Sequence, residues 1–67
     1  MELSDEFIKA TKLSNLKYYE LATIGGLTQV SFSQYINRTR KIIGDKDRLL
    51  SIGEIIGVKK EDVFTSE

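Results

Sequence analysis

Apolar residues recur every three or four positions along most of the chain, and short polar or glycine-containing segments separate these stretches. This pattern predicts an all-α fold with helices at about 5–13, 16–24, 29–37 and 46–56, followed by a short turn or helix within 60–66. The clearest periodicity lies in the fourth helix, whose apolar residues are Leu49, Leu50, Ile52, Ile55 and Ile56.

Residues with suitable capping chemistry stand at the ends of these segments. Ser4, Thr28 and Asp45 precede the first, third and fourth helices, and we expect Asn15 to cap the second. Gly57 is expected to end the fourth helix in the left-handed conformation.

The inward faces of the helices define the expected core of one domain over residues 1–67. The predicted core consists of Phe7, Ile8, Leu16, Leu21, Ala22, Leu27, Phe32, Tyr35, Leu49, Ile52 and Ile56. A chain this short buries little surface and has no cysteine for a disulfide, so we expect a stability on the order of 3–5 kcal/mol. Two roles stay open for Val63 and Phe64: closing this core, or contacting a partner subunit in a homodimer.

The segment 16–37 is the most informative part of the chain, and it predicts two short helices joined at Gly25-Gly26. Ala22 offers a small contact between the helices, and Gly26, four residues later, tolerates the positive φ of a tight turn. The alternative is a Gly-Gly β-hairpin, because Val30, Phe32 and Ser33 partly alternate. The alternation stops at 34–36, which favours the helices.

This arrangement is typical of a helix-turn-helix unit that reads DNA. Its second helix would turn a neutral, mostly polar face outward, made of Thr28, Gln29, Val30, Ser33, Gln34 and Asn37. A solvated face in a chain that is 30% charged would normally carry Lys or Glu, yet residues 27–37 have no charge. A neutral face of this kind suits base edges, or else a protein interface.

The net charge of zero conceals an uneven distribution. Residues 9–41 contain six basic residues and one acid, a local charge of +5, whereas residues 1–8 carry −3 and residues 42–67 carry −2. DNA binding needs a basic face rather than a basic protein, although charge alone fits an ordinary solvated surface equally well. The candidate phosphate-binding residues are Lys17, Tyr18, Arg38, Thr39, Arg40 and Lys41.

Several functions are not indicated by the sequence. Without histidine or cysteine, zinc binding is not expected, and the scattered acids form no acid–base pair or nucleophile assembly. We therefore expect no enzyme, no cofactor and no small-molecule substrate. The short apolar runs predict no membrane span, and Met1 followed by an acidic segment suggests a complete cytoplasmic protein.

Residues 16–64 resemble the Cro/repressor-type (XRE-like) helix-turn-helix proteins of phages and bacteria. The similar blocks, in the family's order, are Glu20-Leu21-Ala22, Gly26-Leu27-Thr28-Gln29, Phe32-Ser33-Gln34-Tyr35-Ile36-Asn37, Ile55-Ile56-Gly57-Val58 and Glu61-Asp62-Val63-Phe64. The chain departs from the family at Lys17, Tyr18 and Arg38, where members usually have serine, glutamine and glycine.

The resemblance implies a five-helix lambda-repressor-like DNA-binding domain and a transcriptional regulator, such as a repressor. Its partner would be a double-stranded DNA operator, with a recognition helix at about 28–37 in the major groove. Gln and Asn on the reading face pair best with adenine, so A·T pairs are expected under the helix centre, with any guanine contact coming from Arg38 or Lys17. The alternative function is a small protein–protein adaptor or antirepressor that uses the same fold.

Overall fold

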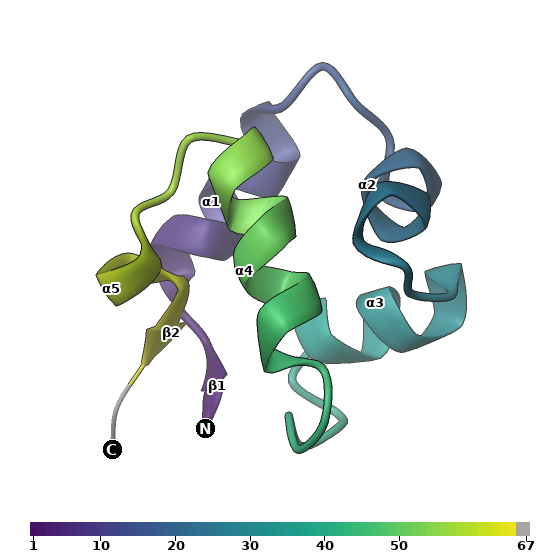
Figure 1. The fold of residues 1–67 in the computed structure, drawn as a ribbon, viewed down its shortest axis with the longest axis vertical. Helices are drawn as coiled ribbons and strands as arrows, with labels where there is room; N and C mark the ends of the chain where they lie inside the picture. The colour runs from purple at the N-terminus through teal and green to yellow at the C-terminus, as the bar shows by residue number, and fades with distance from the viewer. Residues whose placement is uncertain (66–67) are drawn as a thin grey trace.

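Residues 1–65, which the computed structural model describes, form five helices and one two-stranded sheet (Figure 1). The elements in chain order are β1 (Glu2–Leu3), α1 (Asp5–Leu13), α2 (Tyr18–Gly25), α3 (Gln29–Ile36), α4 (Lys46–Ile55), α5 (Lys60–Val63) and β2 (Phe64–Thr65). The five helices are confirmed, and the protein is a small, mostly helical domain. Residue 66, the end of the last predicted segment, lies outside the described residues.

A two-stranded sheet, which the all-α prediction did not include, accompanies the helices. β1 pairs antiparallel with β2, with Leu3 opposite Phe64 and Glu2 opposite Thr65, so the two ends of the described chain lie side by side (Figure 1). Ser4 extends this pairing, because its N–H donates to the Val63 carbonyl at 2.9 Å. Strands of two residues are too short to show an alternating pattern in the sequence. The β-hairpin considered for residues 21–35 is wrong, since α2 and α3 occupy that segment.

The predicted caps at Ser4 and Thr28 are confirmed. The Ser4 hydroxyl accepts from the Phe7 N–H and the Thr28 hydroxyl accepts from the Ser31 N–H, each at 3.1 Å. These bonds satisfy amide groups that have no partner within the helix.

The other two caps differ from the prediction. The second helix begins at Tyr18 rather than near residue 16, so Asn15 is not its cap; Lys17 is. The Glu20 carboxylate accepts from the Lys17 N–H at 3.1 Å, which is the reciprocal half of a capping box. Asp45 occupies the N-cap position of α4, but its carboxylate accepts from the Tyr35 hydroxyl and from Arg48 instead.

Three helices end in the same way, with a residue in the left-handed conformation. These residues are Gly26 after α2 (φ 80°), Arg38 after α3 (φ 59°) and Gly57 after α4 (φ 83°). In each case the N–H of the following residue reaches back to the carbonyl five positions earlier, as from Leu27 to Ala22 at 2.8 Å. This is the Schellman arrangement, and the expected turn at Gly26 and cap at Gly57 are confirmed.

The core is continuous and draws on every helix. Its buried apolar residues are Leu3, Phe7, Leu21, Ala22, Phe32, Tyr35, Ile36, Ile42, Leu49, Ile52 and Val63. Four residues predicted to be core are only half-buried at its edge: Ile8, Leu16, Leu27 and Ile56. Val63 is fully buried, which assigns it to the core, and Phe64 is half-buried beside it in the small sheet. The burial of Val63 leaves it no surface for a homodimer contact, whereas the exposed part of Phe64 keeps that role open.

Gly25 lets α2 approach α4 closely. A Cβ atom at this position would lie 2.5 Å from Cδ1 of Ile52, well inside van der Waals contact. The two consecutive glycines thus have different roles: Gly25 provides the space for α4, and Gly26 adopts the positive φ of the turn that leads to α3.

Candidate nucleic-acid interface

The outer side of α3 and the residues next to it form an uncharged surface, which we call the α3 face. It consists of Thr28, Gln29, Val30, Ser33, Gln34 and Asn37. All of these are exposed except Ser33, which is half-buried although the sequence placed it fully outside. Val30, in the first turn of α3, is 66% exposed, so its methyl groups are part of this surface. The α3 face therefore offers amide, hydroxyl and methyl groups in one surface.

Aromatic packing on the opposite side holds α3 in place. The Phe32 ring is fully buried and meets the Tyr18 ring edge-on, with centroids 5.8 Å apart. It also meets the Phe7 ring at 6.5 Å, so α1, α2 and α3 converge on this residue. Such edge-to-face contacts are favourable and fix the orientation of the rings. Tyr18, a candidate phosphate ligand, thus uses its ring for packing and keeps only its hydroxyl for a ligand.

Lys17 is exposed at the start of α2, where the helix dipole presents its positive end. Such a position favours anions, and the ammonium group adds to that preference. The neighbouring Glu20 carboxylate, bonded to the Lys17 N–H, brings a compensating negative charge.

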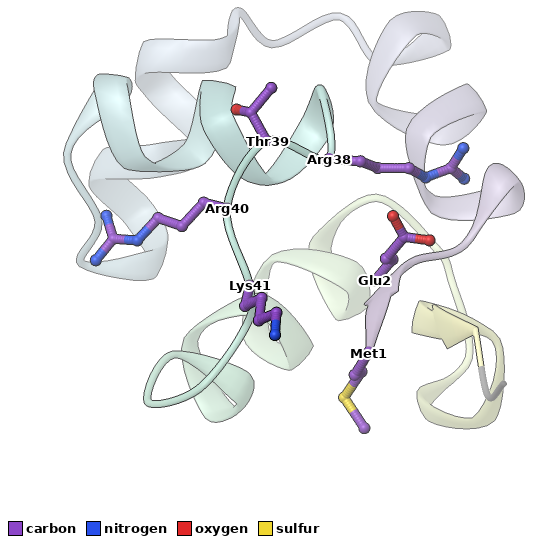
Figure 2. Close-up of a pocket in the computed structure, with 6 residues that line it drawn as sticks. All are labelled: Met1, Glu2, Arg38, Thr39, Arg40 and Lys41. Atoms are coloured by element: carbon purple, nitrogen blue, oxygen red, sulfur yellow. The ribbon is translucent and has the colours of Figure 1, made fainter.

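The remaining candidates lie in the segment between α3 and α4. We call residues 38–41 the basic loop. Together with Met1 and Glu2 at the N-terminus they line a hollow of about 480 Å³ (Figure 2). The Thr39 hydroxyl donates to the Gln34 carbonyl at 3.3 Å, which ties the loop to the end of α3, and Lys41 is exposed.

Arg38 is engaged within the molecule. Its Nη2 donates to the Asp5 carboxylate at 2.5 Å and to the Leu3 carbonyl at 3.2 Å. The hydrogen bond to Asp5 raises the pKa of Arg38 above its ordinary value, so the group stays charged. Arg38 thus joins the end of α3 to the N-terminal segment, and a phosphate would have to compete with these partners.

Arg40 points in the opposite direction from Arg38 (Figure 2). Its Nη1 donates to the Ser31 hydroxyl at 2.8 Å, and its Cζ lies 5.4 Å from the centroid of the Tyr35 ring. The guanidinium therefore lies against α3 itself, beside the α3 face.

Sequence reasoning did not assign a role to Ser31, nor to the contact between Tyr35 and Asp45. The Tyr35 hydroxyl donates to Asp45 at 2.5 Å, and Arg48 donates to the same carboxylate at 3.3 Å. Burial raises the pKa of Tyr35, and the hydrogen bond to Asp45 adds to the increase. Of these contacts, only the ion pair between Asp45 and Arg48 was indicated by the sequence, because the two residues are three positions apart at a helix start.

No protein-family model, curated protein or solved structure matches this chain. Function is therefore inferred from the chemistry of the α3 face and the basic loop.

Hydrogen bonding and charge are the chemistry that these groups can supply. Within residues 1–65 no three His, Cys, Asp or Glu side chains come together to hold a metal ion. In the same part of the chain no helix is long and apolar enough to cross a membrane.

The left-handed conformation of Arg38 leads to a stability prediction. Arg38→Ala and Arg38→Gly both remove the contacts with Asp5 and Leu3, but only glycine adopts φ 59° without steric cost. We expect the glycine variant to be more stable than the alanine variant by about 1 kcal/mol in urea unfolding. The same pair of substitutions at Lys41, whose φ is not positive, should give the reverse order. Equal stability of the two Arg38 variants would contradict this account.

Proposed function

We propose that this protein is a sequence-specific, double-stranded-DNA-binding transcriptional regulator of the Cro/repressor helix-turn-helix type, with α3 as its recognition helix. The observation that carries the proposal is the uncharged α3 face together with the Arg40 guanidinium, which lies against α3 at Ser31 and Tyr35. Lys41 follows Arg40 in the basic loop and Lys17 is exposed before α2, so further cations are available near the ends of the two helices. This arrangement suits base edges in the groove and phosphates on either side of it.

The way in which α2 and α3 are joined also supports the proposal. Three residues connect α2 to α3: the left-handed Gly26, then Leu27, then the Thr28 cap; α3 also packs through Phe32 onto Tyr18. A short connection of this kind holds a recognition helix at a fixed position relative to its partner helix.

A single domain of this size covers about one half-site of an operator. We therefore expect two copies to bind an operator with two half-sites. Because Val63 is in the core, contacts between the copies would have to come from elsewhere on the surface.

The second candidate function is a protein–protein adaptor or antirepressor. The zero net charge and the absence of charged residues on the α3 face favour this candidate. Salt-dependent binding to duplex DNA separates the two candidates, because phosphate contacts release counterions and an apolar protein interface does not.

The experiment that tests the proposed function measures binding to a random-sequence duplex between about 50 and 200 mM salt. The affinity of the wild-type protein should fall steeply as salt rises. Arg40→Ala and Lys41→Ala should each weaken binding to all sequences alike and reduce the magnitude of the salt slope by about one, because each removes a phosphate contact.

Lys60→Ala is the matched control, since Lys60 is an exposed cation on α5, across the molecule from α3 (Figure 1). Its salt slope should equal that of the wild type. If the salt slope were unchanged in the Arg40 and Lys41 variants, the basic loop would be an ordinary solvated surface without phosphate contacts. If the wild-type protein bound no duplex, the proposed function would be excluded.

A further inference from the structure

Two side chains of α3 hold the guanidinium of Arg40. Ser31 and Tyr35 are four residues apart, so they lie on the same flank of the helix. The Ser31 hydroxyl accepts from Arg40 Nη1 at 2.8 Å, and the Tyr35 ring lies under its Cζ at 5.4 Å. An arginine in an exposed loop otherwise samples many rotamers, and these contacts restrict that sampling before any ligand arrives.

The ring under Arg40 is itself fixed. Tyr35 is only 2% exposed, and its hydroxyl donates to Asp45 at the start of α4. The ring is thus packed in the core on one side and bonded to a second helix at its tip. Its position is therefore set by the fold rather than by the loop.

Arg38 shows that this arrangement is particular to Arg40. The two arginines are separated by one residue, yet Arg38 Nη2 bonds to Asp5 and to the Leu3 carbonyl, on the side away from Arg40 (Figure 2). Arg40 presents its guanidinium beside the α3 face. Its bond to Ser31 uses one N–H of Nη1, and a guanidinium has five, which leaves donors for a phosphate.

We propose that Ser31 and Tyr35 are positioning residues that hold Arg40 ready to bind a DNA backbone phosphate beside α3. The contact fixes how deeply and in which register α3 sits in the groove, because a planar guanidinium binds phosphate in a directional way. This inference rests on the proposed function. It assigns to Arg40 a preformed geometry, whereas Lys41 acts only through its charge.

Ser31→Ala is the informative variant. It removes the hydroxyl that holds Arg40, while the backbone N–H of residue 31 still donates to the Thr28 cap, so urea unfolding should match that of the wild type. On a random-sequence duplex we expect the affinity to fall roughly threefold to tenfold, the range for losing one pre-ordered side chain. The salt slope should stay that of the wild type, because no charge is lost.

A double-mutant cycle separates positioning from direct contact. Ser31→Ala should have no further effect in an Arg40→Ala background, because there is no guanidinium left to position. Arg40→Lys should keep the salt slope but lose affinity, since an ammonium cannot reproduce the planar contact.

Two results would overturn the inference. If Ser31→Ala lowered the DNA affinity equally with and without Arg40, Ser31 would contact DNA itself. If Ser31→Ala left the affinity unchanged, the hydrogen bond between Ser31 and Arg40 would have no positioning role. Both leave the salt-dependent binding of the wild type intact, whereas failure of the wild type to bind duplex DNA would remove the proposed function as well.

Discussion

Replacing Leu49 by alanine should remove most of the stability of this protein. Leu49 is fully buried in α4, and truncating a buried leucine costs about 2–5 kcal/mol through lost burial and the cavity left behind. The whole domain is expected to have only about 3–5 kcal/mol. Urea unfolding followed by circular dichroism should therefore show a variant that is partly unfolded even without denaturant.

Ile43→Ala is the control for this prediction. Ile43 is 81% exposed in the segment between α3 and α4, so removing its side chain should change the free energy of unfolding by less than about 0.5 kcal/mol. If the Leu49 and Ile43 variants unfolded at the same urea concentration, the assignment of Leu49 to the core would be wrong.

The second large effect concerns sequence-specific binding. Gln29 and Gln34 are exposed on the α3 face, and glutamine can make two hydrogen bonds with the N6 and N7 atoms of adenine. On a site selected from random duplexes, Gln29→Ala and Gln34→Ala should each weaken binding by about 1–3 kcal/mol. On random DNA the loss should be much smaller, because that binding depends on phosphates.

Asn15→Ala provides the matched control, since Asn15 is an exposed amide in the loop between α1 and α2. This substitution should leave the affinity for both selected and random DNA unchanged. The selected sites should contain A·T pairs at the positions under the centre of α3. A guanine-rich consensus there, or equal losses on selected and random DNA, would contradict the proposed reading face.

Features that depend on a few neighbouring residues could be predicted from the sequence. The caps at Ser4 and Thr28 and the turn at Gly26 involve groups no more than five residues apart, so their residue types are visible in a short window. The inward face of α3, with Phe32 and Tyr35, was likewise visible in its spacing. Because the buried side of a helix also defines its outer side, the α3 face followed from the same pattern.

The N-cap of the second helix was predicted wrongly because two nearby residues could start that helix. Asn15 and Lys17 both stood near the start of the second helix, and Asn15 has the better capping chemistry. Lys17 became the cap because Glu20 accepts its N–H, and because a helix beginning at Tyr18 places that ring against Phe32. The start of α2 at Tyr18 therefore allows the Tyr18 ring to pack on Phe32.

The helices, the caps at Ser4 and Thr28, the turns at Gly26 and Gly57 and the polar character of the α3 face follow from the sequence alone, because each depends on residues close together in the chain. The pairing of Leu3 with Phe64 and the close approach of Gly25 to Ile52 depend on the tertiary structure, because these residues are far apart in the sequence. The tertiary structure also decided that Arg38 bonds to Asp5 while Arg40 lies on α3. The two arginines have the same chemistry in the sequence, and they differ only because the fold brings different partners, up to 35 residues away along the chain, within hydrogen-bonding distance.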